Sequence, residues 1–141
     1  MDIEVLGTPG KPGDVEAIVA LVAAVEHAQQ NELPADFMRL FRTTDPVWTT
    51  AHGQRLSGWE TINEFTHRML PGATAHGTAT YEVARILFIR PDIAAVNVHQ
   101  RPIRLDGTPR ADYPEGRPFY ILADDGEGWK IAAAQNTQVA G

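Results

Sequence analysis

The segment Asp124-Asp-Gly-Glu-Gly-Trp-Lys-Ile-Ala-Ala-Ala-Gln-Asn-Thr-Gln-Val139 decides how this sequence folds. A polar turn leads into a strand that places Trp129 and Ile131 on one face, crosses three alanines and ends in polar residues. Amide side chains at the end of a buried strand need hydrogen-bond partners. They could line a cavity, cap an edge strand or face a partner subunit. Because alternation sends neighbouring amides to opposite faces, we expect one of them, Asn136, in the wall of a cavity.

The composition indicates one globular domain without disulfides. A chain of 141 residues buries roughly two-thirds of its unfolded surface on folding, and 43% of these residues are hydrophobic. The absence of cysteine excludes disulfides, thiolate nucleophiles and thiolate metal sites. The net charge is −6 and the basic residues are scattered, so we expect no nucleic-acid partner. The longest apolar run, residues 17–25, is too short to cross a bilayer, so we expect a soluble, cytoplasmic protein with no membrane partner.

Helical patterns fill the first half of the chain. Residues 1–13 are rich in glycine and proline and predict a flexible leader, followed by a single domain over 14–141. Asp14 stands at an N-cap position, and an apolar pattern of helical period predicts a helix over 14–30. Pro34 suits the first turn of a short second helix that ends near Thr44.

A third helix is predicted after a capping signal. Ser57 and Glu60 have the spacing of a capping box, in which each side chain bonds an unpaired backbone N–H of the first turn. The helix spans residues 59–70, and its expected buried stripe consists of Ile62, Phe65, Thr66 and Met69.

From residue 76 onward the pattern becomes that of β-strands. Short strands are expected earlier, at 47–50 and 55–56, and longer ones over 76–89, 93–103, 119–123 and 129–139. Residues 108–117 predict a mobile connection at the mouth of a cavity. Helices segregated to one side of an antiparallel sheet make an α+β domain. Long, bent strands around three N-terminal helices predict a cone with a hollow interior.

The order and spacing of several short motifs resemble the nuclear-transport-factor-2-like superfamily. These motifs are Asp45-Pro-Val-Trp48, Gly53, Ser57-Gly58, the helix over 59–70, and Trp129-Lys-Ile with Gln135-Asn-Thr137. The superfamily is a cone-shaped α+β fold that includes ketosteroid isomerase, scytalone dehydratase and the SnoaL-type polyketide cyclases. Within it, the closing strand is most similar to the SgcJ/EcaC group, some of which occur in enediyne polyketide biosynthesis.

The resemblance implies a pocket, but its catalytic residues do not carry over. Ketosteroid isomerase uses an aspartate where this chain has Thr49 or Thr50, and threonine cannot abstract a proton at neutral pH without a separate base. SnoaL-type cyclases use an acidic residue where this chain offers Gln135 or Asn136. Members of the superfamily commonly pair through the convex face of the sheet, which implies a homodimer.

His99 and Tyr81 are the candidate catalytic residues. Alternation places His99 opposite Val96 and Val98, so it either faces the cone as an acid or base, or faces outward if the valines take the core side, which we favour. Tyr81 could present its phenol to a ligand or simply pack in the core. Glu26 and Gln29 on the first helix are second-tier candidates. The full set of expected pocket residues is Trp48, Phe65, Met69, Tyr81, His99, Tyr120 and Asn136.

Two classes of function follow from these residues. The first is a protein that binds, and in one version cyclises without a cofactor, a hydrophobic polyketide-type intermediate; the resemblance suggests a polyketide synthase as its partner. The second is a non-catalytic ligand-binding or assembly module, or a structural dimer whose cone is filled. We expect no metal site, because no histidine pair or histidine–carboxylate cluster has metal-ligand spacing.

Overall fold

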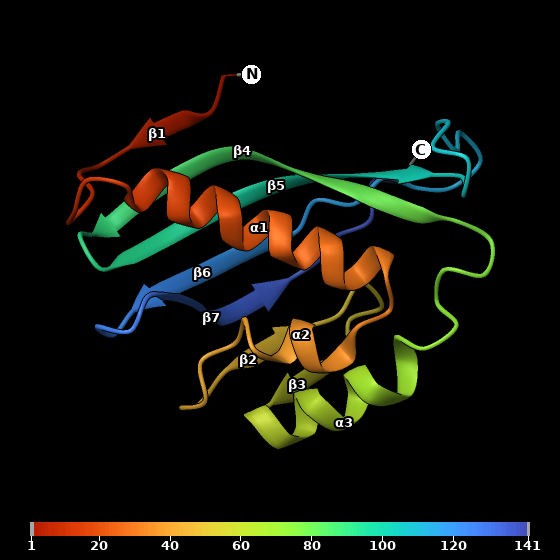
Figure 1. Cartoon of the computed structure of the whole chain (residues 1–141), viewed down its shortest axis with the longest axis horizontal. Helices are drawn as coiled ribbons and strands as arrows, with labels where there is room; N and C mark the ends of the chain where they lie inside the picture. Colours follow the sequence, from red (N-terminus) through yellow and green to blue (C-terminus); the bar gives the residue numbers. More distant parts are fainter. Residues whose placement is uncertain (1, 141) are drawn as a thin grey trace.

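The computed structural model describes residues 2–140 as a seven-stranded sheet curved around three helices (Figure 1). The strand order is β1-β4-β5-β6-β7-β2-β3. The elements are β1 (Glu4–Leu6), α1 (Asp14–Gln30), α2 (Pro34–Met38), β2 (Val47–Thr49), β3 (Arg55–Ser57), α3 (Trp59–Met69), β4 (Thr78–Arg90), β5 (Ile93–Ile103), β6 (Phe119–Asp124) and β7 (Trp129–Gln135). This arrangement confirms the predicted α+β cone with its three helices.

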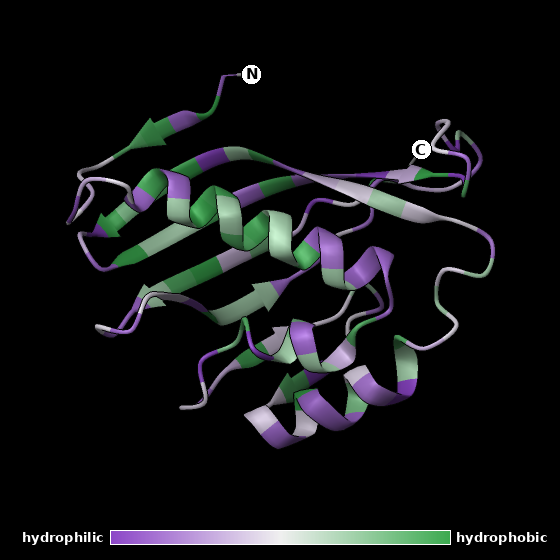
Figure 2. Ribbon diagram, in the orientation of Figure 1, coloured by the Kyte–Doolittle hydropathy of each residue, from purple (hydrophilic) through white to green (hydrophobic). Residues whose placement is uncertain are grey.

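Helix α1 crosses the concave face of the sheet and spans the predicted residues 14–30. Its buried stripe contains Ile18, Val22 and Val25, and Figure 2 shows hydrophobic residues on α1 and on the strands of the sheet. The predicted cap is wrong, because Gly13 occupies the N-cap and Asp14 is the first helical residue. The buried Asp14 carboxylate instead accepts hydrogen bonds from the Lys11 backbone N–H (2.8 Å) and from the indole N–H of Trp129 (3.1 Å). Tertiary contacts therefore decide its role.

Helix α2 ends at Met38, whereas the sequence predicted a helix that reaches Thr44. The following residues pair with β7: the N–H of Ile131 donates to the carbonyl of Leu40 (2.7 Å), and the N–H of Arg42 donates to the carbonyl of Ile131 (3.0 Å). These backbone bonds to a distant strand replace the bonds that would have continued the helix.

Helix α3 begins without the predicted capping box. Its N-cap is Gly58, with no side-chain cap hydrogen bond. Ser57 belongs to β3, where it pairs with Val47, and the Gly58 N–H donates to the carbonyl of Pro46 (2.8 Å). Ile62 and Thr66 are buried as predicted, but the Met69 side chain is 54% exposed at the end of the helix. The predicted buried stripe of α3 is therefore wrong at Met69.

The sheet is mixed, which corrects the prediction of an antiparallel sheet. Strand β1 pairs in parallel with β4, and β2 pairs in parallel with β7. Strand β1 also lies within the segment predicted as a flexible leader. Its three residues are exposed and pair through their backbone, so no hydrophobic pattern announces them. Register shifts in the β4–β5 and β6–β7 pairs mark bulges, which bend strands and increase their twist.

The hydrophobic core lies between the sheet and the helices and fills the end of the cone where α1 begins and β4 ends. Ile86, Phe88, Leu122, Trp129 and Ile131 are buried there against α1. At the other end of the fold, α1 ends, β4 begins and β5 ends, and the side chains leave a cavity. Strand β5 over 93–103 is confirmed, and no helix among residues 2–140 is long and apolar enough to span a bilayer.

Candidate functional site

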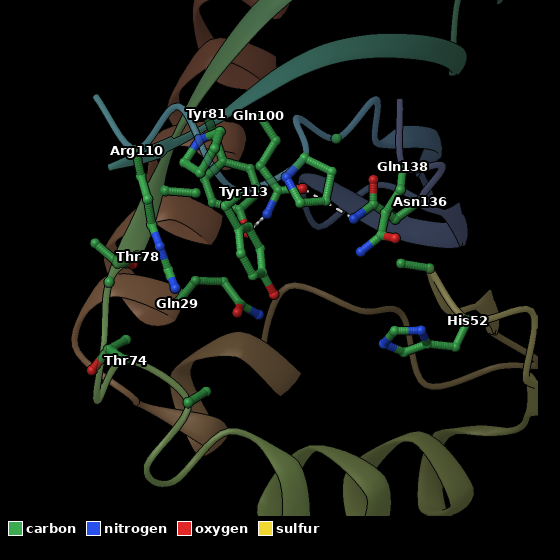
Figure 3. A pocket seen from close by; sticks show the side chains of 17 residues that line it. Gln29, His52, Thr74, Thr78, Tyr81, Gln100, Arg110, Tyr113, Asn136 and Gln138 are labelled. Atoms are coloured by element: carbon green, nitrogen blue, oxygen red, sulfur yellow. Dashed lines mark hydrogen bonds between the residues drawn. The ribbon is translucent and has the colours of Figure 1, made fainter. Parts of the chain in front are cut away.

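The cavity consists of two adjoining parts, which share Gln29, Tyr81, Gln100 and Asn136 in their walls. The outer vestibule has a volume of about 260 Å³ and the inner chamber about 160 Å³. Together they are comparable with the lower part of the range for small-molecule sites, roughly 300–1,000 Å³. Figure 3 shows these side chains converging from α1, β4, β5 and the segment after β7.

Aromatic and apolar side chains form the wall of the inner chamber. They are Val25, Phe37, Trp48, Tyr81, Pro118, Tyr120 and Ala134. The ring centroids of Phe37 and Trp48 are 5.7 Å apart. Phe65 supports the other side of Trp48 in an edge-on contact with centroids 5.4 Å apart, and does not itself line the chamber. The wall therefore favours an apolar ligand body.

A chain of hydrogen bonds runs across the boundary between the two parts. The Asn136 side-chain N–H donates to Oε1 of Gln100 (3.0 Å), and Nε2 of Gln100 donates to the Tyr81 hydroxyl oxygen (3.1 Å). Gly116 lies against this chain, and a Cβ at residue 116 would lie 3.0 Å from Oδ1 of Asn136 and still closer to Oε1 of Gln100. Oδ1 of Asn136 is buried and has no hydrogen-bond partner among the described residues. The boundary therefore presents an unused acceptor.

Tyr81 and Tyr120 remain neutral in this setting. Burial raises the pKa of Tyr81 well above its ordinary value, and the Glu26 carboxylate, whose Oε2 accepts the Tyr81 backbone N–H (2.8 Å), raises it further. Burial also raises the pKa of Tyr120, with a smaller contribution from Tyr81. Since Gln100 donates to the Tyr81 oxygen, the Tyr81 O–H proton is available to a ligand. The chamber thus offers neutral phenol donors.

Apart from the tyrosines, the ionisable residues of the cavity lie in the vestibule. Arg110 and His52 line the vestibule, and within residues 2–140 no aspartate, glutamate or lysine lines either part. The inner chamber therefore contains no side chain suited to abstract a proton at neutral pH. The described residues also contain no group of three or more potential ligands placed to hold a metal ion.

The structure brings four of the predicted pocket residues together: Trp48, Tyr81, Tyr120 and Asn136. Phe65 lies behind Trp48, while Met69 lies on the exposed end of α3. Neither Met69 nor His99 lines the vestibule or the chamber, which corrects their predicted placement.

His99 lies on the opposite face of β5 from the buried Val96 and Val98. Its Nε2 lies 2.8 Å from Oε1 of Glu115, and its Nδ1 lies 3.0 Å from a guanidinium nitrogen of Arg101. The hydrogen bond from His99, followed by that from Arg117, holds the pKa of Glu115 below its ordinary value. His99 therefore belongs to an ion-pair cluster on the outer face of the sheet.

Sequence reasoning missed Gln100, Arg110 and Gly116. Gln100 follows Val96 and Val98 at the alternation of β5, so it continues their inward row, a signal that the more reactive His99 obscured. Arg110 and Gly116 lie in the connection predicted at the mouth of a cavity, and both line the vestibule. No periodic pattern in that connection distinguishes inward from outward side chains.

Comparisons with solved structures show a shared architecture. A domain with a cystatin-like fold from Nostoc punctiforme superposes with a TM-score of 0.80 at 23% identity, over 93% of this chain and 80% of that one. An NTF-2 like protein from Shewanella oneidensis gives 0.72 at 17% identity, covering 87% and 98%. A ketosteroid isomerase-like protein from Erwinia carotovora atroseptica gives 0.72 at 13% identity, covering 93% and 100%.

The two sequence-based comparisons find no relative. No protein-family model matches the chain, and the comparison with curated proteins finds no match. Identities of this size carry the fold and not the activity. The chain therefore has the cone-shaped α+β fold shared by nuclear-transport-factor-2-like and cystatin-like structures.

Proposed function

We propose that the protein binds a mostly apolar small molecule whose carbonyl or hydroxyl oxygen accepts hydrogen bonds from Tyr81 and Tyr120. The observation that carries this proposal is the pair of neutral phenols in an aromatic chamber, the half-buried Tyr81 and the buried Tyr120, where the Tyr81 proton is available to a ligand. A buried donor without a partner costs about 1–3 kcal/mol. A ligand oxygen offsets this cost, while the ligand body excludes water from Phe37 and Trp48.

Binding is better supported than catalysis. Two neutral phenols can polarise a carbonyl, as donors do in an oxyanion-type site. Proton abstraction also needs a base, and no aspartate, glutamate or histidine lines the inner chamber within the described residues. We infer that the protein holds a reactive or poorly soluble compound and passes it on. The observed cavity argues against a structural dimer with a filled cone.

A polyketide-type intermediate is the more specific ligand in this proposal. Such chains combine an apolar body with carbonyl oxygens, which match the chamber and its phenols. The resemblance of the closing strand to the SgcJ/EcaC group supports this version, with a polyketide synthase as the donor or acceptor of the compound.

Calorimetric titration with paired probes tests the proposal. 2-Acetylnaphthalene carries a carbonyl, and 2-ethylnaphthalene has nearly the same shape without one. Because a hydrogen bond contributes about 1 kcal/mol, we expect Tyr81→Phe to weaken ketone binding about fivefold and to leave hydrocarbon binding unchanged. Tyr113→Phe, in the vestibule, is the matched control. If neither probe binds, or if Tyr81→Phe changes both affinities equally, the phenol site is disproved.

A further inference from the structure

The vestibule has a charge opposite to that of the whole protein. The chain contains 18 acidic and 12 basic residues, for a net charge of −6. Within residues 2–140, however, the vestibule wall contains no carboxylate and holds the guanidinium of Arg110. Arginine is charged at every physiological pH. The guanidinium of Arg110 therefore gives the mouth of the cavity a fixed positive charge, which attracts an anion although the protein as a whole is acidic.

Arg110 is held in position by its surroundings. Its backbone N–H donates to the carbonyl of Pro102 (3.1 Å), and its Cζ lies 4.4 Å from the ring centroid of Tyr113. A Cβ at residue 77 would lie 2.9 Å from Nη1 of Arg110, so the absence of a side chain at Gly77 makes room for the guanidinium. Figure 3 shows Arg110 and His52 entering the cavity from opposite sides of the view.

The charge of Arg110 has no carboxylate partner among the described residues. Arg85, Arg90, Arg101 and Arg117 each form an ion pair with an aspartate or glutamate, and none of the ion pairs within residues 2–140 includes Arg110. The contact with the Tyr113 ring compensates the guanidinium only in part for the hydration it loses on burial, and an anion would complete that compensation. Its planar fork matches a carboxylate, which it can bind through two parallel hydrogen bonds.

The inner chamber is an unfavourable place for an anionic group. Tyr81 and Tyr120 are neutral, and the Glu26 carboxylate bonds the backbone N–H of Tyr81. A negative charge placed beside the phenols would be repelled by Glu26, whereas one placed beside Arg110 would be attracted. An anionic group therefore belongs in the vestibule, and an apolar group belongs in the chamber.

We propose that the ligand is an amphipathic carboxylate, which rests on the proposed binding function and specifies its ligand class. The carboxylate binds Arg110 in the vestibule, and the apolar body, with any carbonyl or hydroxyl oxygen, lies in the inner chamber between Trp48 and the two phenols. The arginine then selects for charge at the mouth, while the chamber selects for shape and for an oxygen acceptor.

The test compares charged and neutral probes of equal size by calorimetric titration. A series of ω-(2-naphthyl)alkanoates of increasing chain length is compared with the methyl ketones of the same lengths. A charge-assisted hydrogen bond corresponds to about tenfold or more in affinity. We expect one chain length at which the carboxylate binds about tenfold more tightly than its ketone, with a preference that falls as salt is added.

Variants separate the arginine from the rest of the cavity. Arg110→Gln should remove the carboxylate preference and leave the ketone affinity within about twofold, whereas Arg110→Lys should keep part of the preference because it retains the charge. Arg104→Gln, at an exposed arginine that directly follows β5 and does not line the cavity, should change neither affinity. Thermal melting shows that each variant is folded.

The outcomes distinguish the two proposals. If ketones bind but carboxylates of every length bind no more tightly, or if Arg110→Gln weakens both probes equally, the amphipathic ligand is wrong and the phenol site stands. If ketones and carboxylates both fail to bind, the proposed binding function fails and the ligand class fails with it.

Discussion

Substituting Gly116 by alanine should break the hydrogen-bond chain of Asn136, Gln100 and Tyr81 at the boundary of the vestibule and the chamber. A Cβ there would lie 3.0 Å from Oδ1 of Asn136 and would overlap Oε1 of Gln100. Gly116 does not adopt a left-handed backbone, so the added methyl group causes no backbone strain of its own. The flexible end of Gln100 must therefore move, which removes its hydrogen bonds with Asn136 and Tyr81.

The size of the effect follows from these contacts. Two hydrogen bonds of about 1 kcal/mol each are lost. The alanine restricts the unfolded chain and returns about 0.4–1 kcal/mol. The expected decrease in the free energy of unfolding is about 1–2 kcal/mol, measured by urea denaturation. Because Gln100 no longer holds the Tyr81 hydroxyl, affinity for 2-acetylnaphthalene should also fall about fivefold, for the loss of about 1 kcal/mol of binding free energy.

A double variant provides the control. Gln100→Ala removes the side chain that the methyl group would meet, so Gly116→Ala should cost less in that background than in the wild type. Equal costs in the two backgrounds would show that the methyl group acts elsewhere. A Gly116→Ala protein with unchanged stability and unchanged ketone affinity would refute the reasoning altogether.

Three further predictions concern stability and assembly. Asp14→Ala should lower the free energy of unfolding, measured by chemical denaturation, by at least about 3 kcal/mol. The buried carboxylate accepts two hydrogen bonds, and each is worth about 1.5–3 kcal/mol for a charged acceptor. The pKa of Glu32 is lowered by a hydrogen bond from the Thr74 hydroxyl and by further bonds from the backbone N–H groups of Gly72 and Thr74. The stabilisation that Glu32 provides is therefore complete above the ordinary glutamate pKa, and it is lost as the pH falls through the lowered pKa of the folded state. Melting curves of wild type and Glu32→Gln should therefore converge in acid, and a constant gap down to low pH would contradict this assignment. For assembly, we propose a homodimer that forms through the sheet face opposite the helices, where Leu87 aligns with Ala95 and Ile121. We expect light scattering to show a monomer for Leu87→Glu, and a dimer for the control variant Met69→Glu at the exposed end of α3.

The sequence was informative wherever burial follows a period. Helix α1 over 14–30 and strand β5 over 93–103 match their predictions, because one face of each element must be apolar. The same alternation correctly separated the inward valines of β5 from His99. The polar end of β7 indicated a cavity, and Asn136 lies in its wall.

Backbone pairing between distant segments left no such signal. The end of α2 depends on bonds between Leu40, Arg42 and Ile131, and the start of α3 depends on Ser57 being held in β3. Strand β1 is exposed and attaches to β4 through its backbone and an ion pair between Glu4 and Arg85, and no hydrophobic period marks it. In each case a backbone partner outside the element itself overrode the local preference.

The sequence by itself determined the cone, its apolar chamber and four of the side chains in its wall, Trp48, Tyr81, Tyr120 and Asn136, because hydrophobic period and strand alternation fix which face of an element is buried. Only the tertiary structure decided which polar groups meet there. In the folded protein Gln100 donates a hydrogen bond to Tyr81, and the Tyr81 proton stays available to a ligand. Arg110 lies at the mouth of the cavity, where the absence of a side chain at Gly77 leaves room for its guanidinium. Such contacts depend on the distances between segments that the chain brings together from far apart, and those distances are set by packing.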